Sequence, residues 1–362
     1  MIQLIQSFFY FFHYIFFINK VDVLFYAPQH FNRSHNNNLF FEPLIQTCQR
    51  NKIQYIYIEE PVFNSSIHRN NDAIPFDFIF YIILILRKFK LSDLFIGKIL
   101  RNTFLRKLEF NNYIVLSQSM LEVFRGVNSQ AKFFDLQHGI LYSNKQDYIY
   151  NGKASSNLID NNIQLLISGT KYKEILLASD TSGYFKNNSH VIGSKVSDNI
   201  CLHKKPNNNI LVTLQFTDDH SKKQNMNLLE ELEEFIDNHP DYKFYLKNHP
   251  RFNNEINLSD LYKKKNTERA TYNFIEYVEL CSIHLTAYST SVFECASFGI
   301  PTIFLTSLKK DFNMFSTDFS YPLENNLDYI VKYYLDNTLI VKNWVSDFYV
   351  NFDEAKFLSL LK

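Results

Sequence analysis

The first half of the chain alternates short apolar runs with segments of helical spacing. Between the first two runs, residues 42–50 carry apolar side chains three and four positions apart, which is typical of a helix with one buried face. Short apolar runs separated by helices are typical of βαβ units, so we predict a mainly parallel sheet. The predicted strands are 21–27, 54–58, 113–116, 132–136 and 164–168.

The second half repeats this alternation. Residues 210–216 form a near-continuous apolar run, as expected of a strand buried on both faces. The polar stretch 196–209 precedes this run and is the predicted linker. The elements expected after it are helices at 228–236 and 291–298 and strands at 242–246, 283–286 and 301–305.

A chain of 362 residues exceeds what one hydrophobic core usually covers. We therefore predict two α/β domains, 1–196 and 197–362, and the absence of a visible repeat of 20 to 50 residues excludes a solenoid. Hydrophobic residues make up 46% and charged residues 20%, which favours a folded globular protein. Basic and acidic residues balance at 37 each, so we expect no nucleic acid partner.

The four cysteines lie far apart, with no CxxC pair and no histidine at ligand spacing. This pattern argues against both a disulfide framework and structural zinc, and it fits reduced thiols in the cytoplasm. The residues are Cys48, Cys201, Cys281 and Cys295.

Two segments raise the question of a membrane. The aromatic run 7–17 lacks the basic region and cleavage site of a secretory signal, and it is too short to span a bilayer. It is either an element buried in the first domain or a segment resting on the membrane at the inner face. Residues 75–110 are helical and apolar, then basic, and the basic side chains either form a solvated helix face or attract anionic lipid or a lipid-linked acceptor. They are Arg87, Lys88, Lys90, Lys98, Arg101, Arg106 and Lys107.

Hydroxyl side chains gather where a predicted helix follows a strand in the second half. Ser289, Thr290 and Ser291 stand at the helix start, where unpaired N–H groups and the helix dipole favour a diphosphate. Glu294 would project from the same first turns toward a ribose diol. The alternative is ordinary helix capping by these residues, although capping does not account for the turn at 299–301 that leads into the next strand.

A second motif stands at the carboxyl end of a predicted parallel strand, where α/β sheets place their ligands. Pro250 forces His249 into extended geometry, from which its imidazole could donate a hydrogen bond to a phosphate. Lys247 and Arg251 would add positive charge and stabilise a leaving group. A structural histidine is the alternative, and we interpret the other His-Pro pair, at 239–240, as a turn that ends a helix.

A third motif follows a strand of the first half. Gly139 permits a sharp turn that would expose His138, a candidate general base for an acceptor hydroxyl, although a hydrogen-bonded structural histidine is the alternative. Asp135 and Asp147 are alternative carboxylate bases. The adjacent acids 218–219 have no third metal ligand nearby, and P-loop, GxGxxG, GxSxG and HExxH patterns are absent.

Taken together, these motifs resemble GT-B enzymes of bacterial capsule and lipopolysaccharide assembly, including sialyltransferases, capsular Kdo transferases and teichoic acid glycerophosphotransferases. The resemblance spans about residues 20 to 310, and 192–194 would be the crossing between domains. The Asp/Glu-Asp/Glu-Gly motif of several sialyltransferases is absent, which leaves the sugar and the base open. The motifs are Gln137-His138-Gly139, Lys247-Asn248-His249-Pro250, and Ser289-Thr290-Ser291 followed by Glu294 and Gly299-Ile300-Pro301.

The resemblance implies an α/β, GT-B fold, in which two Rossmann-like domains have parallel sheets facing a central cleft. It implies a nucleotide-sugar donor bound by the second domain, a glycan or lipid-linked glycan acceptor bound by the first, and no obligatory metal or other cofactor. Carried over by position, His249 would contact the donor phosphate and the 289–291 hydroxyls would surround it. Glu294 would hold the ribose and His138 would act as the base.

The leading hypothesis is therefore a glycosyltransferase that extends a bacterial surface polysaccharide, capsule or O-antigen. The His-Pro and Ser/Thr-rich motifs resemble those of enzymes with CMP- and CDP-linked donors more than those with UDP-linked ones, and the hypothesis takes a CMP-linked donor such as sialic acid or Kdo. Three alternatives stay open: a CDP-polyol phosphotransferase, a UDP-sugar 2-epimerase on the same fold, and a non-catalytic relative.

Overall fold

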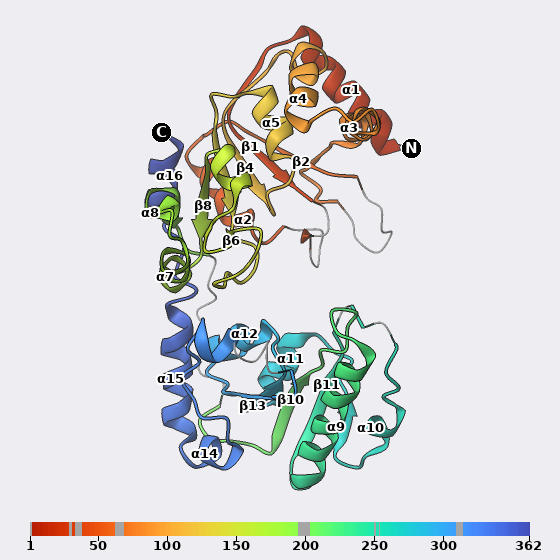
Figure 1. Cartoon of the computed structure of the whole chain (residues 1–362), viewed down its shortest axis with the longest axis vertical. Helices are drawn as coiled ribbons and strands as arrows, with labels where there is room; N and C mark the ends of the chain where they lie inside the picture. Colours follow the sequence, from red (N-terminus) through yellow and green to blue (C-terminus); the bar gives the residue numbers. More distant parts are fainter. Residues whose placement is uncertain are drawn as a thin grey trace. The chain divides into compact units, whose positions relative to one another are not determined.

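The computed structural model describes residues 2–28, 31–32, 38–61, 69–194, 203–249, 251–252, 254–308 and 314–362. The chain divides into two compact units (Figure 1). Unit 1 comprises Met1–Lys195 and Val350–Lys362, and unit 2 comprises Val196–Tyr349. Half of the predicted linker, 196–202, lies outside the described residues.

Unit 1 is built on a seven-stranded parallel sheet in the order β3-β2-β1-β4-β5-β8-β9. The strands are β1 (Asn19–Ala27), β2 (Tyr55–Glu59), β3 (Ile74–Pro75), β4 (Leu108–Leu116), β5 (Lys132–Leu136), β8 (Ile163–Ile167) and β9 (Ser189–Val191), with a small hairpin of β6 (Ile149–Tyr150) and β7 (Lys153–Ala154). The helices are α1 (Ile2–Phe16), α2 (Glu42–Arg50), α3 (Asp77–Lys88), α4 (Asp93–Asn102), α5 (Leu121–Val127), α6 (Ser156–Asp160), α7 (Thr170–Ser179), α8 (Tyr184–Asn188) and α16 (Glu354–Leu361).

Unit 2 contains a five-stranded parallel sheet in the order β12-β11-β10-β13-β14. The strands are β10 (Asn209–Thr213), β11 (Lys243–Lys247), β12 (Thr267–Arg269), β13 (Ile283–Thr286) and β14 (Thr302–Phe304). The helices are α9 (Lys222–Asn238), α10 (Ser259–Lys263), α11 (Phe274–Leu280), α12 (Ser291–Ser297), α14 (Leu327–Lys332) and α15 (Tyr334–Ser346).

Both sheets reverse their strand order beside the first strand of the unit. In unit 1, β1 pairs with β2 on one side and β4 on the other, and in unit 2, β10 pairs with β11 and β13. Such a reversal is a topological switch point, where ligands bind outside the carboxyl ends of the strands of an open α/β sheet. Each unit therefore has one sheet edge at which chemistry is expected.

The end of the chain returns to unit 1, although the sequence assigned 197–362 to the second domain. Phe357 of α16 is buried in the unit 1 core, and Glu354 forms an ion pair with Arg50 at 2.7 Å. Gly193 has a φ of 78°, and a Cβ there would lie 2.3 Å from the carbonyl oxygen of Asn351. The returning segment passes so close that only glycine fits at this point.

The aromatic N-terminal run forms helix α1, which packs on unit 1 through one face. Phe11 and Tyr14 are buried, and the Ser7 hydroxyl accepts a hydrogen bond from the Phe78 N–H of α3 at 3.0 Å. The run is thus a helix seated on the domain, with its opposite face uncovered by the described residues. No helix in the described ranges is both long and apolar enough to cross a membrane.

Candidate functional site

Three loops meet at the carboxyl edge of the unit 2 sheet. Asp219, in the loop after β10, binds Arg251 beyond β11 through two hydrogen bonds of 2.6 and 3.1 Å. The next residue, His220, contacts the Tyr288 hydroxyl beyond β13 at 2.5 Å. The loop of the central strand therefore joins the Lys247–Arg251 segment on one side to the start of α12 on the other.

His249 lies half-buried in this edge, and its neighbours fix its chemistry. Its Nδ1 accepts a hydrogen bond from the Arg251 backbone N–H at 3.1 Å. Burial, together with the Arg251 charge, lowers the pKa of His249 below its ordinary value, so the ring is neutral at pH 7. Since Nδ1 is the acceptor, the ring proton is on Nε2, which has no hydrogen-bond partner among the described residues. The side chain can thus donate one hydrogen bond to a ligand. Pro250 lies outside the described residues.

The two cations predicted beside His249 have protein partners. The Lys247 ammonium donates to the carbonyl oxygen of Tyr272, and the Arg251 guanidinium is paired with Asp219. Asp219 therefore acts as an ion-pair partner, and the pair lowers its pKa. No group of three or more potential metal ligands occurs in the part of the chain that the structure describes.

At the start of α12, part of the predicted hydroxyl cluster is buried and part is exposed. Thr290 and Glu294 are exposed, four residues apart and hence on one face of the helix. Ser291 points inward and is buried, whereas Ser289 is half-buried. The Ser289 Oγ accepts hydrogen bonds from the Ser291 N–H at 3.2 Å and the Ser291 hydroxyl at 2.7 Å. The exposed pair is the part of the cluster that a ligand can reach.

A buried polar network below α12 was missed by the sequence analysis. Thr213 Oγ1 lies 2.9 Å from His284 Nε2, 2.9 Å from the Thr286 hydroxyl and 3.1 Å from that of Ser291. On the other side of its ring, His284 Nδ1 lies 3.0 Å from the Thr302 hydroxyl. Burial lowers the pKa of His284 to about 3, so the whole network is neutral. The network ties the helix start to β10, β13 and β14. The signal in the sequence that could have indicated this network was polar residues, such as Thr213 and His284, inside otherwise apolar strands.

The far end of α12 is fixed by the predicted glycine turn. Gly299 has a φ of 75°, and the Ile300 N–H donates to the Cys295 carbonyl at 2.9 Å, a C-terminal cap that suits glycine. Phe293 stacks on Trp344 of α15 with ring centroids 5.1 Å apart. The helix that presents Thr290 and Glu294 is therefore held at both ends.

In unit 1, His138 follows β5 at the carboxyl edge, but its side chain is half-buried and not exposed as the motif predicts. Gln137 fixes this loop, because its Oε1 accepts from the Ser168 N–H at 2.9 Å and its Nε2 donates to the Gly139 carbonyl at 2.7 Å. The ring of His138 contacts that of Phe31 edge-on, with centroids 4.8 Å apart. Its role as a base stays a prediction.

The two alternative bases differ in access. Asp135 is buried and accepts hydrogen bonds from the Tyr148 hydroxyl at 2.7 Å and the Gln118 N–H at 3.0 Å. Burial raises its pKa to about 7. Asp135 thus braces the loop from below. Asp147 is exposed and, with Gln118 and Tyr150, lines a shallow polar depression of about 360 Å³.

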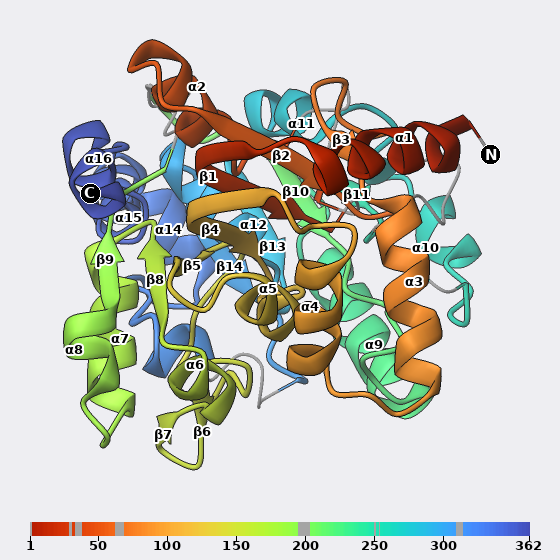
Figure 2. The same cartoon turned by 90° about the horizontal axis from the view of Figure 1, so that it is seen from above.

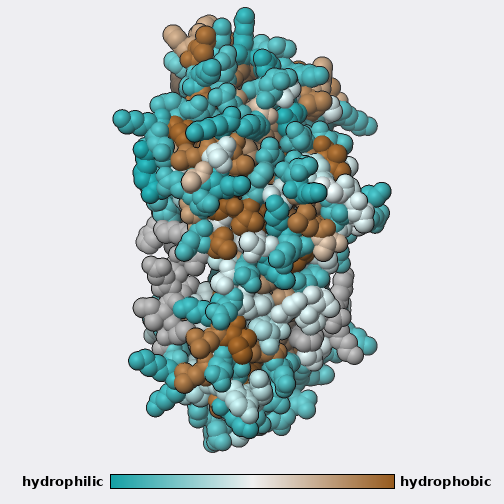
Figure 3. Space-filling model, turned by 90° about the vertical axis from the view of Figure 1, so that its left-hand side faces the viewer, coloured by the Kyte–Doolittle hydropathy of each residue, from teal (hydrophilic) through white to brown (hydrophobic). Residues whose placement is uncertain are grey.

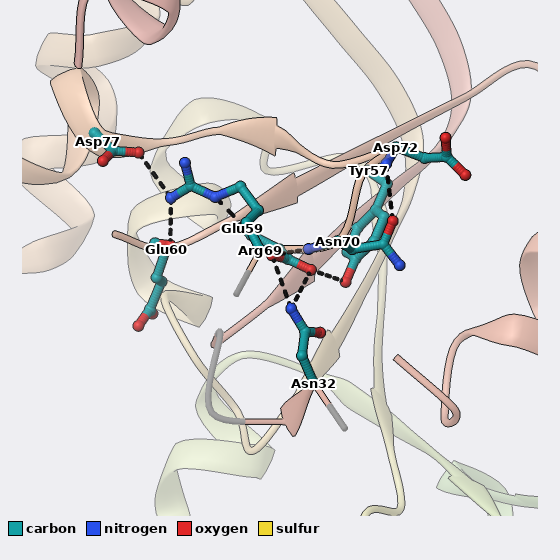
Figure 4. Close-up of polar contacts among 8 residues, drawn as sticks. All are labelled: Asn32, Tyr57, Glu59, Glu60, Arg69, Asn70, Asp72 and Asp77. Carbon is teal, nitrogen blue, oxygen red and sulfur yellow. Dashed lines mark hydrogen bonds and ion pairs between the residues drawn. The ribbon is translucent and has the colours of Figure 1, made fainter. Parts of the chain in front are cut away.

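A buried charge network at the ends of β1 and β2 was also missed (Figure 4). The carboxylate of Glu59 is fully buried and accepts from the Asn32 amide at 3.1 Å, the Asn70 N–H at 3.1 Å and the Tyr57 hydroxyl. Arg69 lies between acids, donating to Asp77 at 2.8 Å while its Nε is 3.9 Å from Glu59. Burial raises the pKa of Glu59. Two carboxylates and one guanidinium thus lie beside the carboxyl end of β2.

Comparison with known proteins finds no matching family model and no matching curated protein. Solved structures do match over nearly the whole chain. MnaA of S. aureus with UDP is 13% identical, with 95% of each chain covered and a TM-score of 0.53. UDP-GlcNAc 2-epimerase of Methanocaldococcus jannaschii with UDP-GlcNAc and UDP is 15% identical, covering 95% of this chain and 99% of the other, with a TM-score of 0.53.

The wall teichoic acid polymerase TagF, in a variant soaked with CDPG, is 12% identical, covering 99% of this chain and 91% of the other, with a TM-score of 0.52. Identities this low show the fold alone. All three neighbours are GT-B proteins, and the described residues likewise form two α/β units with parallel sheets. The chain has the GT-B fold.

Proposed function

We propose that the protein is a metal-independent glycosyltransferase that uses a nucleotide-activated sugar to extend a bacterial surface polysaccharide. The observation that carries the proposal is the carboxyl edge of unit 2, where the loops after β10, β11 and β13 are joined through Asp219–Arg251 and His220–Tyr288. That edge presents a neutral hydrogen-bond donor beside a helix start, which suits a phosphate ester. The fold is shared with proteins solved with UDP and CDPG.

Each group of this edge has a distinct role in the proposal. His249 donates from Nε2 to a phosphate oxygen, and this hydrogen bond strengthens as negative charge develops on the leaving nucleotide. The Thr290 hydroxyl lies at the phosphate, and Glu294, one turn along, accepts hydrogen bonds from the ribose diol. Ser289 and Ser291 position the helix start through their mutual hydrogen bonds. Lys247 adds positive charge at the same strand end.

In the transfer itself, an acceptor hydroxyl attacks the anomeric carbon of the donor. The carbon–oxygen bond to the phosphate breaks, and the nucleotide leaves with that electron pair. The hydroxyl proton passes to His138 of unit 1, whose loop is fixed by Gln137. Asp147 is the exposed alternative base, because Asp135 is enclosed by Tyr148 and Gln118.

The donor class rests on the resemblance of the motifs to those of enzymes with CMP- and CDP-linked donors, and we favour a CMP-linked nonulosonic acid such as sialic acid or Kdo. A CDP-polyol, as in teichoic acid phosphotransferases, is the related choice. The acceptor would be a glycan or lipid-linked glycan in the cytoplasm or at the inner membrane face.

Incubation with single donors tests the proposal. The protein is mixed with CMP-sialic acid, CMP-Kdo, CDP-glycerol or UDP-GlcNAc, with and without oligosaccharide acceptors, and free nucleotide and glycan products are separated by chromatography. Release of CMP with a lengthened glycan supports a glycosyltransferase, and release from CDP-glycerol moves the assignment to the phosphotransferase. Nucleotide binding without release of free nucleotide from any donor would support assignment as a non-catalytic relative.

A UDP-sugar 2-epimerase is the second candidate, because the structure contains converging carboxylates that were not evident from the sequence. Glu59 and Asp77 converge on Arg69 beside the carboxyl end of β2, and solved UDP-GlcNAc 2-epimerases share the fold. In the same assay an epimerase would convert UDP-GlcNAc into its C2 epimer without any acceptor. Inversion at C2 would replace the transferase proposal.

A further inference from the structure

Helix α1 has two apolar faces, of which only one is covered. Phe11 and Tyr14 face the core, as does Ser7, whose hydroxyl accepts a hydrogen bond from the backbone of α3. Residues spaced three and four apart form the opposite face, and Phe9 and Phe16 there are 66% and 61% exposed. An ordinary surface helix would carry polar residues on that face. The uncovered residues are Ile2, Ile5, Phe9, Phe12 and Phe16.

Helix α3 lies beside α1 (Figures 1 and 2) and also carries exposed apolar side chains. Tyr81, Ile85 and Phe89 follow one another at four-residue steps, and Phe89 is 72% exposed. The ring of Phe8 connects the two helices, since it lies 5.4 Å from Phe12 and 5.0 Å from Phe78 of α3. We call Ile2, Ile5, Phe9, Phe12 and Phe16 together with Tyr81, Ile85 and Phe89 the α1/α3 surface.

Positive charge lies at one end of the α1/α3 surface. Helix α1 contains no acidic side chain, and two of the three acids in residues 77–109 are neutralised. Asp77 is paired with the buried Arg69, and Asp93 is paired with Arg87 at 2.7 Å. The third acid, Glu109, is exposed. Exposed basic side chains of this segment include Lys88, Lys90, Lys98 and Arg106.

We infer that the α1/α3 surface docks on an anionic lipid bilayer, with α1 lying in the plane of the interface. Aromatic and aliphatic side chains would enter the region between headgroups and acyl chains, and the lysines beside them would contact lipid phosphates. Charge complementarity selects this occupant over a second copy of the chain. In a symmetric dimer through this surface, the partner's α1 and α3 would offer these lysines no unpaired acid, since α1 has none and Asp77 is paired with Arg69. The inference is independent of the proposed transfer reaction.

Exposed apolar residues elsewhere provide a matched control. On the face of the molecule in Figure 3, hydrophilic side chains predominate and apolar ones form separate groups. In unit 2, Leu335 and Leu339 of α15 are 58% and 57% exposed, with the acid Asp336 between them. Replacing them removes exposed apolar area of a similar kind without touching the α1/α3 surface.

The test is flotation of the full chain with vesicles of phosphatidylcholine alone or mixed with phosphatidylglycerol. Wild type is expected to float with the anionic vesicles, less so as salt is raised. Phe9→Ser/Phe16→Ser/Phe89→Ser and Lys88→Glu/Lys90→Glu should each bind at least tenfold more weakly, whereas Leu335→Ser/Leu339→Ser should bind like wild type. Circular dichroism checks that each variant is folded.

Three results would overturn the inference. Wild type would fail to float with anionic vesicles, or the folded aromatic variant would float as well as wild type. Alternatively, light scattering would show that wild type is a dimer and that the aromatic variant is a monomer, which would assign the surface to a second copy.

Discussion

The carboxyl edges of the two sheets share a topology but differ in charge. Unit 1 places Glu59, Asp77 and Arg69 beside the carboxyl end of β2, whereas unit 2 places hydroxyls and the neutral His284 below its switch point. A phosphate diester would be repelled by buried carboxylates and accepted by neutral donors. The comparison supports the proposal that a nucleotide binds to unit 2 and that an uncharged hydroxyl-bearing acceptor binds to unit 1.

The largest effect is expected from breaking the ionic network of unit 1. Arg69→Met leaves two buried carboxylates without their cation and should destabilise unit 1 by about 3 to 5 kcal/mol. Urea unfolding is followed by far-UV circular dichroism and by fluorescence of the single tryptophan, Trp344, which lies in unit 2. The part of the dichroism change that comes from unit 1 should move to lower urea, while the fluorescence transition, which reports on unit 2, stays.

Arg50→Met is the matched control for that experiment, because Arg50 pairs with Glu354 on the exposed surface of unit 1. An exposed pair contributes about 1 kcal/mol or less. Equal losses of stability from the two substitutions would show that the buried network stabilises unit 1 no more than an exposed ion pair does.

The next effect concerns the neutral donor of unit 2. His249→Ala should lower kcat/KM for transfer by roughly 30- to 1,000-fold, which corresponds to about 2 to 4 kcal/mol of transition-state stabilisation. The other His-Pro histidine gives the control: His239 contacts the Phe235 carbonyl at 2.7 Å and ends α9, so His239→Ala should leave turnover unchanged. Unchanged turnover in His249→Ala would remove this residue from the site.

The pH dependence of unit 2 should be governed in part by His284. Its pKa is about 3 in the fold and rises to its ordinary value on unfolding. The unfolded chain therefore binds the extra proton below about pH 6.5, and stability is lost as pH falls from there toward 3. Its contribution has a slope of up to about 1.4 kcal/mol per pH unit. His284→Gln should remove this slope from urea titrations monitored by Trp344; an unaltered slope would contradict the buried neutral assignment.

Asp135 should give unit 1 the opposite dependence. Its pKa is raised to about 7, so the folded state holds a proton that the unfolded state releases above about pH 4. Stability from this group is therefore full at low pH and falls as pH rises toward 7. Asp135→Asn should flatten that fall in dichroism-monitored unfolding. A fall that persists unchanged would mean that Asp135 is ionised in the fold.

Local patterns predicted much of the fold. Helix α2 and strands β5 and β13 begin and end at the predicted residues, because their apolar periodicity is set by neighbours in sequence. The packing partner of α16 could not be predicted in this way. Its sequence marks an apolar face, but no local pattern indicates that Phe357 packs in the core of unit 1. The 197–362 boundary was therefore wrong at its C-terminal end.

The candidate site, like the fold, could be predicted only in part. Lys247, His249 and the 289–294 segment lie at strand ends because parallel sheets require it. Which hydroxyls face outward depends on the residue at which α12 begins, since one residue turns a helix by about 100°. The Glu59–Arg69 network has no motif, because its members come from separate segments that only the folded sheet brings together.

The most direct test of the central claim is a thermal-shift panel with CMP, CDP, UMP and UDP on wild type, His249→Ala and Glu294→Ala. A nucleotide at 100 times its Kd should add about 2.7 kcal/mol to the stability of unit 2. We predict that cytidine nucleotides raise the Tm more than uridine nucleotides, and that both variants lose most of this rise. No shift with any nucleotide, or shifts that both variants retain in full, would contradict a nucleotide site at the carboxyl edge of β10, β11 and β13.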